Sequence, residues 1–305
     1  MKLPALSGEL RGILLVLSAM AMFGLMDGIS KLLTGHYPPT QILFLRYLLS
    51  IPVAVLLASR IGLRTALHTH RPFFQLARVV IIVVEMVLVL FAYRLMPLAN
   101  AHAIFAATPL IVVALSVPVL GEKVGLRRWI AVLIGFVGVL IAVRPGPDML
   151  TSGAIPTLIA TGLYAVYQLM TRIVTRVDRA ETTFLIQIVA GTALQAPFVP
   201  FVWVDPTPMH WPLFAAIAAL GAVSHLMLIH ALQAAPAAVV QPFTYSMLLW
   251  ATLVGWLFFG DLPDAWTISG GALVVAAGLY AAVREQRLRN EERSALSAAD
   301  SRGAT

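Results

Sequence analysis

The sequence EKVGLRR at residues 122–128 and the sequence DLPDAWT at residues 261–267 occupy the same place in two copies of an internal repeat. The same offset of 139 residues lays LMPLANA (95–101) over AAPAAVV (234–240) without a gap. The first of the two connections has three positively charged residues, whereas the second has none. Lysine and arginine in short loops keep those loops on the cytoplasmic side of a membrane. The two copies are therefore predicted to cross a membrane in opposite directions.

The beginnings of the two copies match as well. With an offset of 141 residues, Phe23 lies over Tyr164 and Asp27 lies over Gln168. Each copy holds five apolar stretches, and because five is odd, the second copy must enter the membrane from the other side. The loop VDPTPMHW at residues 204–211 agrees with this, since it has no Lys or Arg. Inverted repeats are typical of alternating-access carriers, whose substrate sites lie near the midplane between the halves.

The composition requires a membrane around nearly the whole chain. Of its 305 residues, 60% are hydrophobic and 11% are charged, whereas an ordinary soluble domain has about 25% charged residues. The apolar stretches suffice for ten spans of ~20 residues each. We predict an all-α polytopic membrane protein with ten transmembrane helices arranged as two inverted five-helix repeats. The predicted spans are residues 12–33, 39–59, 72–94, 98–120, 127–143, 153–171, 182–203, 211–233, 237–259 and 264–283.

The distribution of Lys and Arg predicts the orientation. Of the 21 such residues, 16 fall in the termini and the even-numbered connections, and only Lys31, Arg94 and Arg144 fall on the other side. Both termini are therefore predicted to be cytoplasmic, in a multi-pass protein of the inner membrane. The net charge of +7 is thus a topology signal, which predicts the lipid bilayer and not nucleic acid as a partner. The predicted parts are an N-terminus (1–11), a first repeat (12–147), a second repeat (148–284) and a cytoplasmic tail (285–305).

Three stretches resemble a known family. Residues 93–141 read YRLMPLANAHAIFAATPLIVVALSVPVLGEKVGLRRWIAVLIGFVGVLI, residues 230–279 read HALQAAPAAVVQPFTYSMLLWATLVGWLFFGDLPDAWTISGGALVVAAGL, and residues 44–47 read FLRY. Together they are similar to the drug/metabolite transporter superfamily, specifically to its bacterial members with two EamA domains. The resemblance implies a transporter whose central cavity is lined mainly by helices one, three, four, six, eight and nine, with helices five and ten at the periphery. Relatives in that superfamily export aromatic amino acids, threonine or homoserine, or toxic cations, or take up S-adenosylmethionine or riboflavin.

Ionisable side chains inside the spans are the first candidates for a functional site, because each costs at least ~2.5–3.5 kcal/mol at mid-bilayer. Glu85 lies at the centre of the third span, and its repeat counterpart, allowing one residue of slack, is His225 in the eighth. His102 in the fourth span overlies Gln241 in the ninth. We expect Glu85 to be a proton-coupling or cation-binding carboxylate, unless it ties helices together by binding Arg78. The two histidines are candidate substrate-binding residues, although a histidine bonded to a backbone carbonyl would give the same pattern.

Asp27, Lys31 and Arg46 are predicted to form a structural or gating ion pair. Lys31 lies one turn beyond Asp27, and Arg46 lies at a similar depth in the second span. Both cations need a partner in a medium of low dielectric constant, so either one is expected to pair with Asp27. Gly24 and Gly28 flank the carboxylate in a GxxxG step, which lets another helix approach closely.

Aromatic and amide side chains share faces of two spans. Tyr164 and Gln168 lie on the sixth span, and Gln241 and Tyr245 lie on the ninth, at helical spacing. This mixture suits an amphipathic organic solute better than an inorganic ion, although the tyrosines would look the same at an ordinary helix contact. Trp250, further along the ninth span, either closes the cavity or packs against a neighbouring helix.

Small residues cluster in the fifth and tenth spans. Gly135 and Gly138 lie in one, and Gly270 and Gly271 lie in the other. Such runs suit tight helix contacts, either within the chain or across the seam of a homodimer.

The sequence has no motif of an enzyme or of an ATP-driven pump. It contains no GxxxxGK[ST], no HExxH, no GxSxG and no cysteine, so we predict no enzyme, no cofactor and no metal. The predicted function is secondary active transport of a small organic metabolite, coupled to protons or driven by exchange. The expected solute is zwitterionic or aromatic, such as an amino acid, riboflavin or S-adenosylmethionine. An exporter of toxic cationic drugs is the alternative, and an integral-membrane enzyme or receptor is a more remote one.

Overall fold

The computed structural model describes residues 8–120, 126–143, 153–175, 177–234, 241–280 and 283. The predicted boundary between the two halves, at residues 147 and 148, lies outside these ranges, as does the predicted tail at residues 285–305.

The described residues form helices and no strands, as the composition predicts. The long helices are α1 (Gly8–Thr34), α2 (Pro39–Ser59), α4 (Pro72–Leu95), α8 (Ala154–Val174) and α10 (Trp211–Ala234). The shorter ones are α3 (Leu63–Ala66), α5 (Leu98–Phe105), α6 (Thr108–Leu120), α7 (Leu126–Val143), α9 (Ala180–Gln195) and α12 (Ser246–Phe259), with the 3-10 helices η2 (Val199–Phe201) and η3 (Gln241–Tyr245). A last helix covers Ala265–Tyr280. Six stretches of these helices are long and apolar enough to cross a membrane.

The fourth and ninth predicted spans are each built from two pieces. α5 and α6 meet at a turn over residues 106–107, and η3 leads directly into α12. Proline has no N–H to donate, and Pro109 takes the second position of α6, where a helix does not need that donor. The Thr108 hydroxyl donates to the Phe105 carbonyl at 2.7 Å, which gives one carbonyl at the break a partner.

The seventh span is shorter than predicted. α9 has 16 residues, or about 24 Å at 1.5 Å per residue, whereas the prediction ran to residue 203. The α-helix ends at Gln195: Ala196 still donates to the Thr192 carbonyl, but Pro197 has no N–H to continue the hydrogen bonds of the helix.

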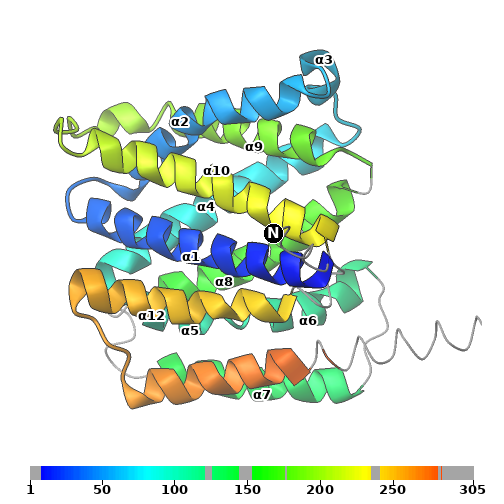
Figure 1. Cartoon of the computed structure of the whole chain (residues 1–305), viewed down its shortest axis with the longest axis vertical. Helices are drawn as coiled ribbons and strands as arrows, with labels where there is room; N and C mark the ends of the chain where they lie inside the picture. Colours follow the sequence, from blue (N-terminus) through cyan, green and yellow to red (C-terminus); the bar gives the residue numbers. More distant parts are fainter. Residues whose placement is uncertain are drawn as a thin grey trace, which may run out of the picture.

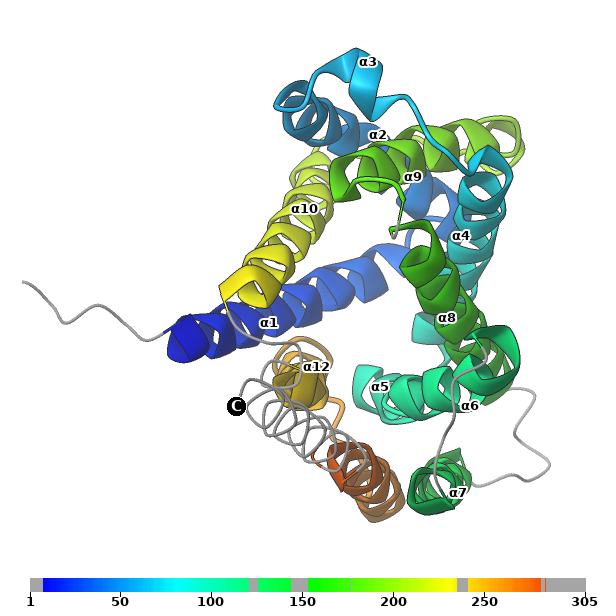
Figure 2. The same ribbon diagram turned by 90° about the vertical axis from the view of Figure 1, so that its right-hand side faces the viewer.

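The helices pack with an internal twofold relation. α1 packs against α10, and their repeat counterparts α8 and α4 pack against each other. α2 packs against its own counterpart α9. Figure 1 shows that most of the helices run in roughly the same direction across the molecule. Figure 2 views the molecule from one end of these helices and shows α1 between α10 and α12. The two halves therefore interlock and do not sit side by side as separate bundles.

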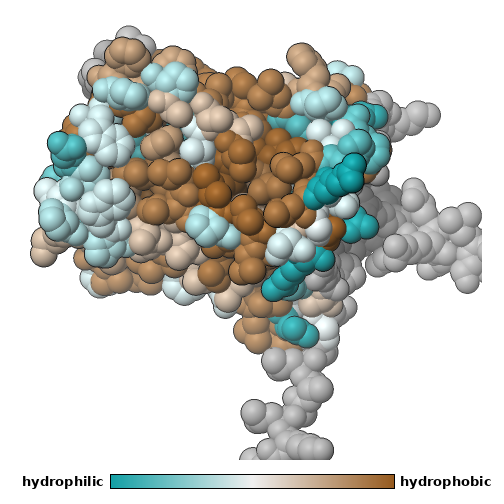
Figure 3. Space-filling model, turned by 90° about the horizontal axis from the view of Figure 1, so that it is seen from above, coloured by the Kyte–Doolittle hydropathy of each residue, from teal (hydrophilic) through white to brown (hydrophobic). Residues whose placement is uncertain are grey.

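The surface has the pattern of a membrane protein. Figure 3 shows a broad hydrophobic band between two more polar ends. Large apolar side chains such as Leu133, Phe136 and Leu257 are exposed within the spans. A continuous apolar surface of this kind is stable in hydrocarbon and not in water.

The glycine runs of the fifth and tenth spans face each other inside the chain. A Cβ atom on Gly138 of α7 would lie 2.8 Å from the Gly270 carbonyl oxygen, and one on Gly135 would lie 3.8 Å from the Cβ of Ala277. Glycine is required for this close approach of α7 to the last helix. These residues therefore form an intrachain contact, and the prediction of a homodimer loses the seam that motivated it.

Candidate functional site

Glu85 of α4 is a buried carboxylate at the centre of the bundle. Only 3% of the surface of this residue is exposed to solvent. Among the residues that the structure describes, its Oε2 atom has no hydrogen-bond partner. The charged groups close enough to act on it are Arg46 of α2 and Asp27 of α1. Such an oxygen is costly to leave unpaired, which marks this carboxyl group as a candidate for binding a proton or a solute.

Arg46 belongs to α2, and its side chain reaches α4 and α10. Its Nη1 atom is 3.5 Å from the Met86 Sδ atom of α4. On α10, a Cβ atom on Gly221 would lie 3.6 Å from the Arg46 Nε and Nη2 atoms. The guanidinium group thus lies close to the α10 backbone at Gly221, and 9% of the Arg46 surface is exposed.

Asp27 contacts His102, and not either of the expected cations. The Asp27 Oδ2 and His102 Nε2 atoms are 3.1 Å apart, with 15% and 10% of the two side chains exposed. The Tyr93 hydroxyl lies 3.3 Å from the same His102 nitrogen. The pairing of Asp27 with Lys31 or Arg46 was therefore wrong. The pair found in the structure joins α1 to α5, and Tyr93 adds α4.

Lys31 reaches the other half of the chain instead. Its Nζ atom is 2.7 Å from the Asp261 Oδ2 atom, and it also donates to the Met96 carbonyl at 3.2 Å. Asp261 follows α12, whose end is fixed by Gly260 in the left-handed conformation, φ +69°. That conformation lets the N–H groups of Gly260 and Asp261 bond back to α12 carbonyls, which is the ordinary helix end at glycine. Sequence reasoning did not predict Asp261 as a site residue, although its place in the repeat under Glu122 was a usable signal.

A cavity of about 410 Å³ opens beside this ion pair. Its walls include Lys31, Thr34, Tyr93, Arg94 and Phe259. Tyr93 is shared between this cavity and the Asp27–His102 pair. The cavity, the Lys31–Asp261 ion pair and the Asp27–His102 contact therefore adjoin one another along α1, and Glu85 lies near enough to Asp27 to experience its charge.

His225 of α10 is bonded to its own helix. Its Nδ1 atom is 2.8 Å from the Gly221 carbonyl oxygen. A carbonyl only accepts, so Nδ1 carries a proton and the Nε2 lone pair of a neutral ring remains available. The ring meets Phe23 of α1 edge to face, with centroids 5.1 Å apart, and lies 6.2 Å from the Phe184 ring of α9.

Of the predicted site residues of α8, Tyr164 belongs to a stacked aromatic pair. Tyr164 and Tyr167 stack with ring centroids 5.9 Å apart. The Tyr167 hydroxyl donates to the Gln187 Oε1 atom at 2.7 Å. Gln168, on the same helix, is half-buried. Tyr167 was not singled out from the sequence, although it follows Tyr164 by one helical turn.

The predicted residues of the ninth span do not form one face towards Glu85. The Tyr245 hydroxyl packs against Gly278 of the last helix, so this ring points towards the periphery. The Trp250 Cβ atom lies against Gly24 of α1, where it packs at the crossing of α1 and α12. The side chain of Gln241 lies outside the described part of the chain.

Arg78 does not bind Glu85. Its guanidinium Nη1 group donates to the Tyr167 hydroxyl and to Gln187 Oε1, both at 2.9 Å, and Nη2 donates to the Thr183 carbonyl at 2.9 Å. The tie between Arg78 and Glu85, which was the alternative role of Glu85, is therefore contradicted by the structure. Within the described ranges, no three His, Asp or Glu side chains are grouped as a metal site.

Comparisons with known proteins agree with this arrangement. Residues 10–144 and residues 151–283 each match the EamA-like transporter family. A riboflavin transporter of Rhizobium johnstonii is 30% identical over 289 residues, which cover 92% of this chain and 93% of that protein. An S-adenosylmethionine uptake transporter of Rickettsia prowazekii is 21% identical, and the match covers 93% of this chain and 96% of that protein. The pseudopaline exporter of Pseudomonas aeruginosa is 28% identical, with 87% of this chain and 94% of that protein covered.

A solved structure shows the same fold. It superposes with a TM-score of 0.64 at 19% identity, over 89% of this chain and 96% of that chain. The predicted membrane fold of two repeats is confirmed by the two family matches and the all-helical structure. The chain therefore belongs to the EamA-like transporter family, as a multi-pass membrane protein that transports a small metabolite and is not an enzyme.

Proposed function

We propose that this chain is a secondary carrier for a flat, amphipathic metabolite, with riboflavin as the first candidate, and that Glu85 couples transport to protons. The observation that carries the proposal is the unpaired, buried carboxylate oxygen of Glu85. An ionised carboxylate without hydrogen bonds is unstable in a medium of low dielectric constant. A proton or a hydrogen-bond donor on the solute would remove that cost, so the binding of either one is linked to the state of the bundle.

The neighbours of Glu85 supply both charge and a path for protons. Arg46 attracts the ionised carboxylate, whereas Asp27 repels it. His102 lies 3.1 Å from Asp27. When this pair gains or loses a proton, the charge that acts on Glu85 changes. Two acids and one histidine at this depth suit proton-linked carriage, in which one group releases a proton as another binds it.

The aromatic side chains favour a flat solute. Tyr164 stacks on Tyr167, and Phe23 and His225 meet edge to face on the other side of the bundle. Ring faces bind planar solutes over a large area, and carboxyl, imidazole and amide groups bind polar atoms at the edges. Riboflavin combines a planar ring system with a polyol chain, and the name of the 30% identical relative supports it as the first solute to test.

The orientation follows from the charge distribution. We propose that both termini are cytoplasmic, because most Lys and Arg residues lie in connections on that side. The cavity beside Lys31 then opens on the opposite, periplasmic side of the inner membrane.

The test is transport of labelled riboflavin into proteoliposomes that hold the purified protein, with and without a pH gradient. Glu85→Gln is permanently neutral and mimics the protonated side chain. We expect it to lose accumulation driven by the pH gradient at least tenfold, while exchange of riboflavin across the membrane at equal pH continues. Glu181→Gln, in the first turn of α9, is the matched control and should transport like the unchanged protein.

Two results would contradict parts of the proposal. Accumulation by Glu85→Gln that still follows the pH gradient would remove the coupling role of Glu85. Gradient-driven accumulation of S-adenosylmethionine but not of riboflavin would replace the solute and leave the coupling role in place.

A further inference from the structure

Two buried polar contacts join the halves of the chain at opposite ends of the molecule. The first tie lies at the end where α1 stops and α10 begins. The Tyr37 hydroxyl is 2.7 Å from His210 Nδ1 and accepts the Thr207 N–H at 3.1 Å. The Gln41 amide donates to the Val204 carbonyl at 2.6 Å and accepts the Val204 N–H at 2.9 Å. Tyr37 is 3% exposed and Gln41 is fully buried, whereas the loop residues that they bind are more exposed.

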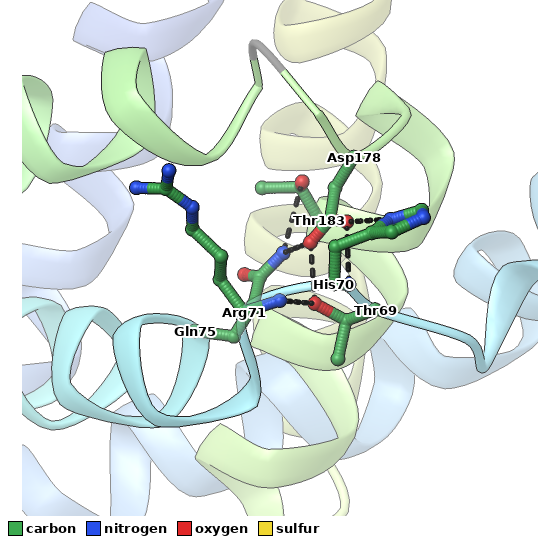
Figure 4. Close-up of polar contacts among 6 residues, drawn as sticks. All are labelled: Thr69, His70, Arg71, Gln75, Asp178 and Thr183. Carbon is green, nitrogen blue, oxygen red and sulfur yellow. Dashed lines mark hydrogen bonds and ion pairs between the residues drawn. The ribbon is translucent and has the colours of Figure 1, made fainter.

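The second tie lies at the other end, between the connection α8–α9 and the start of α4 (Figure 4). The Asp178 carboxylate accepts the Thr69 hydroxyl, the His70 N–H at 2.9 Å and the Gln75 amide at 3.0 Å. The Gln75 amide also lies 3.2 Å from the Thr183 hydroxyl at the start of α9. No part of the Asp178 side chain is exposed to solvent.

The two ties are repeat counterparts of each other. Tyr37 and Asp178 are 141 residues apart, and so are Thr69 and His210. This is the same offset that matches the first and sixth spans. The chemistry differs, since one tie pairs a phenol with an imidazole and the other pairs a carboxylate with a hydroxyl. The contact has thus kept its position while its residues changed, which indicates that the architecture needs a fixed point there.

The helices between the ties are packed along their length. α2 contacts its counterpart α9, and the Tyr47 ring fills the space above Gly191, where even a Cβ atom would overlap it. Tyr47, Leu185 and Ile188 are buried in the same apolar cluster. α2 and α9 are therefore packed along their length, the start of α2 is bonded to the loop after α9, and the start of α9 is bonded to α4. Separating the halves at this edge would break these hydrogen bonds.

The opposite edge combines the close glycine contact of α7 with the last helix and one partly exposed ion pair. There the Lys31–Asp261 ion pair joins the halves, with 14% and 30% of the two side chains exposed. It lies beside the cavity of about 410 Å³ and can therefore be reached by water. Below it, Gly24 and Gly28 of α1 pack closely against Trp250 and Val254 of α12, because small residues let two helices approach each other.

We infer that α2 and α9 form the fixed edge of this carrier, and that solute passes when the loop bearing Asp261 separates from α1 and from the corner between α4 and α5. Breaking the single Lys31–Asp261 ion pair costs less than breaking either tie, because each tie consists of several hydrogen bonds. The motion is thus a swing about the fixed edge, with the Lys31–Asp261 pair as the gate. The inference rests on the proposed function as a secondary carrier, and it adds the place at which the protein opens.

The chain has no cysteine, so pairs of introduced cysteines test this directly. The gate pair is Leu95→Cys with Leu262→Cys, which flank the two oxygen groups that Lys31 binds. The fixed pair is His36→Cys with Met209→Cys, which flank the first tie at the same end of the molecule. All four side chains are exposed. The His36 ring lies beside His210 of the first tie, with centroids 4.8 Å apart, and the other three residues belong neither to the ion pair nor to a tie. Both double variants should transport riboflavin like the unchanged protein while reduced.

A short bis-methanethiosulfonate reagent then links each pair, and intact-mass measurement reports the link. We expect the linked gate pair to lose at least tenfold in riboflavin flux and to recover after reduction with dithiothreitol. The linked fixed pair should keep its flux to within twofold. A block by the linked fixed pair, or unchanged flux through the linked gate pair, would overturn the inference.

Distances between spin labels on the same cysteines separate this inference from the proposed solute. In lipid, the gate pair should show two distance populations, and the fixed pair should show one narrow population. This holds whichever metabolite is carried, so a protein that moves no riboflavin still reports on the swing. One narrow distance at the gate pair, or two at the fixed pair, would show that the protein does not open at this edge.

Discussion

Asp178 shows how one loop carboxylate holds two halves of a membrane protein together. Burial raises the pKa of this carboxyl group, but hydrogen bonds from the His70 N–H, the Thr69 hydroxyl and the Gln75 amide favour the charged form and lower the pKa to about 2. In the unfolded chain the pKa is about 3.9. A lowered pKa stabilises the fold at every pH above the unfolded value, and this contribution disappears as the pH falls through about 2.

Replacing Asp178 by Asn should therefore destabilise the protein in a pH-dependent way. An amide presents an NH₂ group where the carboxylate accepts, so at least one buried donor loses its partner, at a cost of ~1–3 kcal/mol. Thermal unfolding in detergent should show a lower midpoint for Asp178→Asn at pH 7, and the difference should narrow between pH 4 and pH 2. Asp205→Asn, in an exposed loop, serves as the control. A difference that stays constant down to pH 2 would contradict the ionised tie.

Single residues also show what the sequence could predict about the site. Glu85, Asp27 and His102 stand out because an ionisable group in an apolar span is rare and expensive. Their partners could not be predicted, because partners depend on how the helices pack. Lys31 lies one turn from Asp27, yet its long side chain binds Asp261 in the other half. Asp178 and Asp261 were missed, since an acid in a loop looks like any solvated charge.

At the scale of helices, the seam between α1 and α12 decides whether the centre of the bundle can move. A Cβ atom on Gly28 would overlap the Val254 Cγ1 atom of α12. Gly28→Ala should destabilise the protein by ~1–3 kcal/mol, because the two helices must shift to make room. Val254→Ala in the same chain removes the overlapping methyl group and should restore much of the loss. The measurement is the thermal midpoint in detergent together with riboflavin flux.

Gly162 of α8 provides the matched control for this seam. An added Cβ atom there meets nothing within 4 Å. Because alanine favours a helix more than glycine, Gly162→Ala should be neutral or stabilise by up to ~1 kcal/mol. Equal losses in Gly28→Ala and Gly162→Ala would show that the close approach at Val254 has no special effect.

The helices themselves were predicted better than their ends. Length and hydrophobicity predicted the apolar helices, because a span must satisfy its own backbone hydrogen bonds in lipid. The boundaries depend on local chemistry that hydrophobicity does not reveal. α9 ends before Pro197, and the fourth span breaks into α5 and α6. Tyr245 was expected on a cavity face and instead packs on Gly278, because helical spacing fixes a face but not the neighbour that it meets.

For the molecule as a whole, the repeat is the most informative feature of the sequence. The contact of α1 with α10 recurs as the contact of α8 with α4, and the two ties recur at the same offset. The period therefore predicts which helices meet. It does not predict which side chains make the contact, since Tyr37 and Asp178 share a position and no chemistry. The packing of the helices is therefore repeated, whereas different side chains stabilise it in each half.

The orientation of the whole molecule in the membrane can be tested by labelling from one side. The loops that hold most of the Lys and Arg residues are expected to stay in the cytoplasm, which places His68 inside and Met209 outside. Both side chains are exposed, and the chain has no other thiol once either is changed to cysteine. In right-side-out vesicles, a membrane-impermeant maleimide should label Met209→Cys at once and label His68→Cys only after the vesicles are opened. The reverse pattern would invert the carrier and move the cavity beside Lys31 to the cytoplasmic side. Equal labelling of both before opening would mean that the two loops share one side, which an inverted pair of five-helix repeats does not allow.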